Sequence, residues 1–84
     1  MEYLFTFVNT FAAIQAQDRL DVQKIPFNVM PLPSSLGDSC GICLRVKNND
    51  LADVQNEFKQ SKIALTGFYQ IQVINGKKRY QLCH

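Results

Sequence analysis

Residues 3–20, YLFTFVNTFAAIQAQDRL, decide the fold because they join a strand pattern directly to a helix pattern. The segment 3–8 is aromatic and β-branched, a composition that favours a β-strand. Asn9 or Thr10 can then cap a helix, since short polar side chains accept hydrogen bonds from the first turn. The chain therefore opens with a predicted β-α unit.

The predicted first helix has one apolar face made of small side chains. Ala13, Ala16 and Leu20 recur at i, i+3 and i+7, which would let the helix lie close to a sheet. Arg19 is predicted to face away from that sheet. The helix is expected to end at residues 24–26, because Pro26 disfavours helical geometry in the residue before it.

The middle of the chain adds two strands. Residues 27–32 alternate and predict a second strand, and Pro31 suggests either an edge strand or the end of a strand, because proline donates no ladder hydrogen bond. Residues 33–39 are rich in Pro, Ser and Gly and predict a loop. Residues 40–47 predict a third strand, with Ile42, Leu44 and Val46 on one face and Cys43, Arg45 and Lys47 on the other.

The remaining elements are a helix and two strands. After turn and cap residues at 48–50, apolar side chains at Leu51, Val54 and Phe58 predict a second amphipathic helix. Residues 68–73 and 79–83 predict two strands, joined through the Asn75-Gly76 pair that favours tight hairpin turns.

The order of these elements predicts an α+β fold. It is β-α-β-β-α-β with one further strand, and a ferredoxin-like sandwich with an additional C-terminal β-strand forming a hairpin is its economical packing. We expect one domain over residues 1–84, since a chain of 84 residues supports a single core.

Composition narrows the classes of function. Hydrophobic residues make up 46% of the chain, enough for a modest core without disulfides or metal. The net charge of +2 is too small to argue for binding to nucleic acid or to a membrane surface, so we expect neither partner, and no apolar run reaches the length of a membrane span. The cluster Lys77-Lys78-Arg79 is interpreted as a solvated turn.

The three cysteines indicate a reducing compartment. No secretory signal precedes them, because Glu2 stands where a basic region would be and polar residues interrupt the apolar run at Asn9. We expect a cytoplasmic protein with reduced thiols, in which a structural disulfide between Cys40 and Cys43 is disfavoured.

The run Cys40-Gly41-Ile42-Cys43 is the constellation that suggests chemistry. A cysteine that stands between an irregular loop and an apolar strand is placed to be accessible on the loop side and fixed in position by the strand. Gly41 removes a side chain beside the sulfur, so a partner's backbone or a second sulfur can approach.

Residues 13–46 resemble a small bacterial domain family of selenium/sulfur carrier-like proteins. The resemblance rests on four motifs in a fixed order: Ala13-Ile14-Gln15-Ala16-Gln17-Asp18-Arg19-Leu20, Ile25-Pro26-Phe27, Pro31-Leu32-Pro33 and Cys40-Gly41. It implies that Cys40 is a carrier thiol that bears sulfur or selenium as a persulfide or selenosulfide. Gly41 would shape the site and Cys43 would be auxiliary.

A carrier of this kind is not a self-sufficient enzyme. It requires a donor protein that loads the thiol and an acceptor protein that unloads it, but no cofactor and no bound metal. The sequence identifies neither partner and does not distinguish sulfur from selenium.

Three other interpretations of the thiols stay open. Strand alternation would put Cys40 on the face of Ile42 as a small buried hydrophobe, which suits a protein-interaction module that forms homodimers through sheet edges or faces. A redox pair of Cys40 and Cys43 requires a bulge or turn at Gly41, because an extended strand separates the two by about 10 Å. A zinc site would recruit the terminal pair Cys83-His84 from a strand about 14 Å away.

The remaining polar and aromatic residues give little indication of catalysis or of RNA binding. The acidic residues of the helices, Glu57 among them, are predicted to be solvated rather than paired for acid–base catalysis. An RNA-binding role is disfavoured because the third strand carries no aromatic side chain, so Phe5 and Phe7 are assigned to the core.

Overall fold

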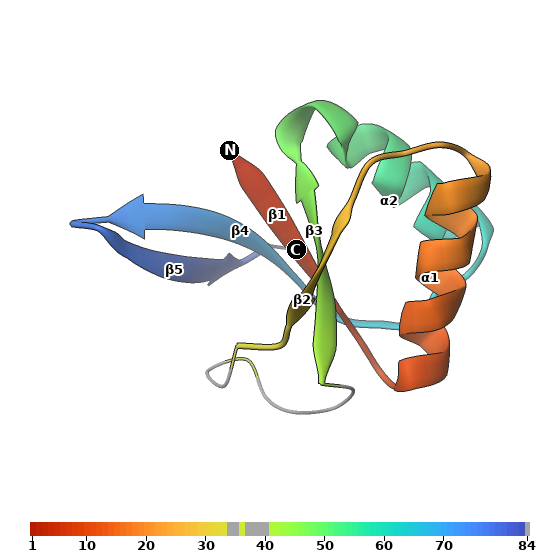
Figure 1. The fold of residues 1–84 in the computed structure, drawn as a ribbon, viewed down its shortest axis with the longest axis horizontal. Helices are drawn as coiled ribbons and strands as arrows, with labels where there is room; N and C mark the ends of the chain where they lie inside the picture. The colour runs from red at the N-terminus through yellow and green to blue at the C-terminus, as the bar shows by residue number, and fades with distance from the viewer. Residues whose placement is uncertain (34–35, 37–40, 84) are drawn as a thin grey trace.

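The computed structural model describes residues 1–33, 36 and 41–83, which form an α+β fold of two helices and a five-stranded antiparallel sheet (Figure 1). The elements are β1 (Glu2–Phe7), α1 (Thr10–Val22), β2 (Asn28–Pro31), β3 (Ile42–Lys47), a 3-10 turn η2 (Asn48–Asp50), α2 (Leu51–Gln60), β4 (Leu65–Ile74) and β5 (Lys77–Leu82). The predicted α+β class is confirmed.

The strands lie in the order β2-β3-β1-β4-β5, with antiparallel pairing throughout. Both helices cover the same face of the sheet, over β1 and β3 (Figure 1). Phe5 and Phe7 of β1 are buried there against Phe58 of α2, as expected from the sequence. The small side chains predicted for α1, Ala13 and Ala16 among them, are fully buried in the same core.

Local signals set the ends of α1. Asn9 is its N-cap, and the Asn9 Oδ1 accepts a hydrogen bond of 2.8 Å from the backbone N–H of Ala12. The expectation that Pro26 ends the helix is wrong, since α1 already stops at Val22. Lys24 takes a left-handed conformation with φ 58° and the Ile25 N–H donates to Leu20 O, which is a Schellman motif.

The second helix ends in the same way. Lys62 has φ 54°, the Ile63 N–H donates to Phe58 O at 3.0 Å, and Ile63 is buried in the core. In both motifs a lysine holds the left-handed position and the next isoleucine contacts the core, so the apolar contact stabilises the helix end.

Several strands differ in length from the prediction. Strand β2 is shorter, at Asn28–Pro31, and it is an edge strand as Pro31 indicated. Strand β3 begins at Ile42 rather than at residue 40, because Gly41 has φ +76° and leaves the extended conformation. Strands β4 and β5 are longer at the turn, so Lys77-Lys78-Arg79 belongs to a strand and not to the turn itself.

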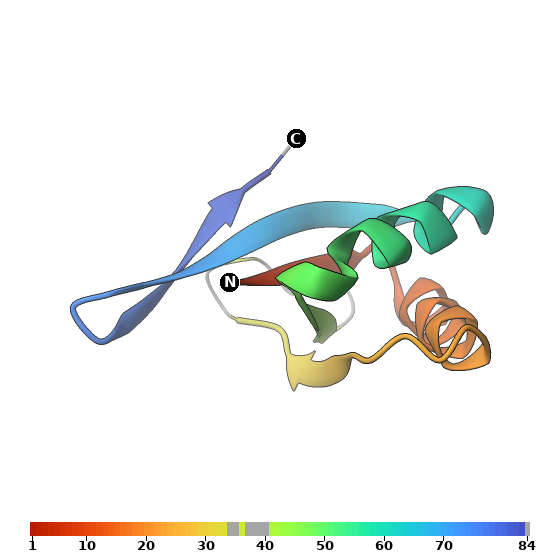
Figure 2. The same ribbon diagram turned by 90° about the horizontal axis from the view of Figure 1, so that it is seen from above.

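Strands β4 and β5 project beyond the helices (Figures 1 and 2). The turn between them is Asn75-Gly76, with φ values of 52° and 77° that match the two left-handed positions of a tight hairpin turn. Ile74 and Lys77 pair across it. No helix within the described residues is long and apolar enough to cross a membrane.

Candidate functional site

The segment that carries Cys40 runs between β2 and β3, and its two ends are held together. The N–H of Leu32 donates a hydrogen bond of 3.0 Å to the carbonyl of Gly41, which continues the pairing of Pro31 with Ile42. Within the segment, the N–H of Leu36 donates to the carbonyl of Pro33 at 2.9 Å. Cys40 itself lies outside the residues that the structure describes, so its predicted accessibility is not tested.

Gly41 follows Cys40 and takes a conformation that suits glycine. Its φ of +76° lies in the left-handed region, and a Cβ added there would meet no described atom within 4 Å. The requirement for glycine is therefore conformational rather than steric. Gly41 thus precedes β3 and is not part of its extended run, and the alternative that packs Cys40 on the face of Ile42 lies outside the described residues.

Cys43 lies in β3 and is fully buried. The sequence places it on the face away from the helices, and the register agrees, since it pairs with Met30 of β2 and Thr6 of β1. Its Sγ lies 3.7 Å from the carbonyl oxygens of both Met30 and Pro31. The thiol is thus packed against the end of the edge strand that leads into the Cys40 segment.

Cys83 does not join this group. It follows β5, which stands three strands away from β3 in the sheet, and adjacent strands are spaced by about 4.8 Å. Its side chain is partly exposed, and its Sγ lies 3.7 Å from Gln81 O. The described residues contain no group of His, Cys, Asp and Glu that could hold a metal ion; Cys40 and His84 lie outside them.

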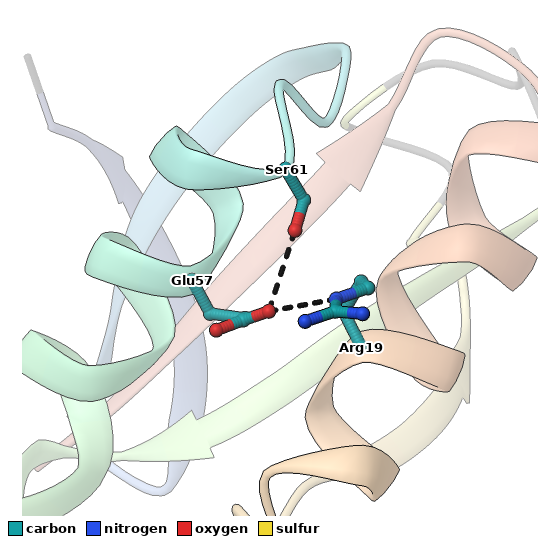
Figure 3. A network of polar contacts seen from close by, with 3 residues as sticks. All are labelled: Arg19, Glu57 and Ser61. Carbon is teal, nitrogen blue, oxygen red and sulfur yellow. Dashed lines mark hydrogen bonds and ion pairs between the residues drawn. The ribbon is translucent and has the colours of Figure 1, made fainter.

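A polar network between the helices is a feature that the sequence interpretation missed. The Arg19 Nε lies 2.8 Å from the Glu57 Oε1, and the Ser61 hydroxyl donates to the same oxygen at 3.3 Å (Figure 3). The Glu57 side chain is only 7% exposed and that of Arg19 is 40% exposed. The predictions that Arg19 faces away and that Glu57 is solvated are therefore wrong.

The burial of Glu57 left a signal in the sequence. It stands three residues after Val54 and directly before Phe58, so it falls on the apolar face of α2. A carboxylate at such a position needs a partner, and Arg19 of α1 supplies it.

A pocket of 490 Å³ lies beside strand β5. It is lined by Leu36, Gln72, Lys78, Arg79, Tyr80 and Gln81. Leu36 belongs to the segment between β2 and β3, and the other five residues belong to β4 and β5. Lys78 and Arg79 of the hairpin therefore lie on the same pocket as Leu36 of the connection between β2 and β3.

The structure thus combines an α+β fold with a connection, between β2 and β3, whose two ends are joined by the hydrogen bond from Leu32 to Gly41. The chain belongs to the family described as "Putative Se/S carrier protein-like", which matches residues 2–70. The match contains Cys40, Gly41 and Cys43, whereas β5 and Cys83 lie beyond it. No curated protein and no solved structure matched the chain.

Proposed function

We propose that this protein carries sulfur or selenium on the thiol of Cys40, as a persulfide or selenosulfide. The observation that carries the proposal is the match to the Se/S carrier family over residues 2–70. The other two thiols are poorer candidates for the carrier role. Cys43 is fully buried, and Cys83 lies outside the matched residues.

Loading is a transfer of one sulfur between two thiol groups. The Cys40 thiolate attacks the terminal sulfur of a persulfide on the donor protein. The new S–S bond forms on Cys40 while the donor's S–S bond breaks, and the donor cysteine leaves as a thiolate. Unloading repeats this chemistry, with an acceptor nucleophile attacking the terminal sulfur and Cys40 leaving. Atoms and electrons balance without an external oxidant or reductant.

Gly41 and Cys43 support the thiol in different ways. Gly41 has a left-handed backbone, its carbonyl accepts a hydrogen bond from the Leu32 N–H, and a Cβ added there would meet no described atom within 4 Å, which supports its role in shaping the site. Cys43 is the auxiliary thiol. Because it is buried, it can attack the sulfur on Cys40 only after the packing around it opens.

The carrier works between a donor and an acceptor protein in the reducing cytoplasm, where thiols stay available. The element order β-α-β-β-α-β followed by β5 supports a ferredoxin-like arrangement as the scaffold. In this arrangement both helices occupy one face of the sheet, and the segment that contains Cys40 connects β2 with β3.

The test is an intact-mass measurement under native conditions, after incubation with a cysteine desulfurase and cysteine. We expect the wild-type mass to increase by one sulfur atom and to return to its original value when a thiol reductant is added. Cys83→Ser is the matched control and should load like the wild type, whereas Cys40→Ser should not load and should keep its fold.

Two results would contradict the carrier function. One is an unchanged wild-type mass under conditions that load another carrier protein. The other is loading that persists in Cys40→Ser. The first result would favour the alternative in which the protein is a non-catalytic interaction module, for which the packed thiol of Cys43 is the supporting observation.

A further inference from the structure

Strand β5 is an open edge of the sheet, and its unpaired backbone groups can be assigned. The Cys83 N–H donates to Phe68 O at 2.7 Å, so these opposite residues form a hydrogen-bonded pair. Pairs alternate along an antiparallel ladder, which makes Gln72 and Arg79 a hydrogen-bonded pair as well. By the same alternation Gln81 pairs with Gln70. The backbone N–H and C=O groups of the alternate residues Lys78, Tyr80 and Leu82 therefore point away from β4.

The two faces of this hairpin differ in chemistry. Tyr80 and Leu82 pair with Ile71 and Tyr69, and these four lie on the sheet face away from the helices. Leu82 is 50% exposed there. On the other face Arg79 pairs with Gln72, whose amide donates to the Gln81 Oε1 at 2.8 Å. A strand that added to β5 would thus meet Tyr80 and Leu82 on one face, with Lys78 beside them near the turn, and polar or cationic side chains on the other face.

All charged side chains of the β4-β5 hairpin are positive. Lys77, Lys78 and Arg79 are all exposed, and strands β4 and β5, both fully described, contain no acidic residue. None of the three cations forms an ion pair within the described part of the chain. An acidic segment of another molecule would complement these exposed cations, because sheet edges attract strands of complementary charge.

We infer that the edge of β5 binds an extended segment of another protein in which acidic and apolar residues alternate. Main-chain hydrogen bonds to Lys78, Tyr80 and Leu82 would hold this segment as a sixth strand, and its acidic side chains would face Arg79 and Lys77. A second copy of β5 fits less well, since it would bring the same three cations to the interface without any acid.

The position of the edge connects it with Cys40. The pocket of 490 Å³ joins Lys78, Arg79 and Tyr80 to Leu36, which precedes Cys40 in the same connecting segment. A protein docked on β5 would therefore be placed next to that segment. Identifying this protein as the sulfur donor or acceptor depends on the proposed carrier function, whereas docking at the edge does not.

The experiment is an NMR titration of isotope-labelled protein with a short capped peptide in which Glu alternates with Val. We expect the largest shifts, and new protection from hydrogen exchange, at the amides of Lys78, Tyr80 and Leu82. In Arg79→Glu the affinity should fall roughly tenfold, because an attraction becomes a repulsion. Lys59→Glu is the matched control on α2; it changes the net charge equally and should bind the peptide like the wild type.

The outcomes separate this inference from the carrier function. Cys40→Ser should bind the peptide normally even though it cannot be loaded with sulfur, because the proposed main-chain contacts are made by Lys78, Tyr80 and Leu82. The inference is wrong if the peptide does not bind, if its shifts lie away from β5, or if Arg79→Glu and Lys59→Glu have equal effects. It is also wrong if sedimentation shows that the edge is occupied by a second copy of the chain.

Discussion

At the scale of single residues, Gly41 links the Cys40 segment to the sheet. Its left-handed backbone costs an alanine about 1 kcal/mol, whereas asparagine tolerates this region better. We therefore expect Gly41→Ala to lower the free energy of unfolding by about that amount and Gly41→Asn to lower it less. Urea denaturation of both variants measures the difference. Equal stability of Gly41→Ala and the wild type would show that the positive φ is not maintained.

A second residue-scale feature is Gly67 in β4, where there is little room for a side chain. A methyl group added at Gly67 would lie 2.6 Å from Tyr69 Cε1, because the Tyr69 ring lies across this glycine. At Gly67 a side chain is opposed by this contact, whereas at Gly41 the space is open and a side chain is opposed by the backbone angle. The two glycines thus have separate reasons for lacking a side chain, and only Gly41 borders the proposed carrier site.

At the scale of elements, the pair Arg19–Glu57 fixes α1 against α2. Arg19→Ala would leave the Glu57 carboxylate buried, with the Ser61 hydroxyl as its remaining partner among the described residues. We expect a loss of about 2 kcal/mol, near the value for a hydrogen bond to a charged group, because the partial exposure of Arg19 limits the penalty.

Denaturation curves check this value. Lys59→Ala removes an exposed cation from α2 and should change stability by less than about 0.5 kcal/mol. In the double variant with Glu57→Gln, the cost of Arg19→Ala should shrink, because no buried carboxylate is left to pair. A loss that is the same with Glu or Gln at position 57 would argue against the ion pair.

The same elements show what the sequence could reveal. Periodicity located both helices and their buried faces, since Ala13, Ala16 and Val54 follow the helical repeat and lie in the core. It did not locate the partner of Glu57, because that contact joins residues 38 positions apart. Alternation likewise placed Cys43 on the face away from the helices, but its burial depends on packing around β2 and β3 that no local pattern contains.

At the scale of the whole molecule, the strands that flank the proposed carrier segment and the edge strand β5 lie at opposite ends of the sheet. The strand order is β2-β3-β1-β4-β5, and the β4-β5 hairpin projects beyond the helices (Figure 2). Within the described residues, Leu36 of the connection between β2 and β3 lines a pocket together with residues of the hairpin. The proposed docking edge thus belongs to a different strand from those that flank the proposed carrier segment, while Leu36 of that segment lies beside it.

The rate at which Cys43 reacts tests whether the folded protein as a whole protects this thiol, for which we propose the auxiliary role. In reduced Cys40→Ser/Cys83→Ser protein, Cys43 is the remaining thiol, buried in β3 between β2 and β1. We expect alkylation to be slow in native buffer and to accelerate with urea in proportion to global unfolding. A Cys40→Ser/Cys43→Ala protein, which keeps the partly exposed Cys83, is the control and should react quickly without urea. If Cys43 instead reacts fast at a rate that urea does not change, β2 opens locally as an edge strand. The auxiliary thiol would then reach Cys40 without unfolding of the domain.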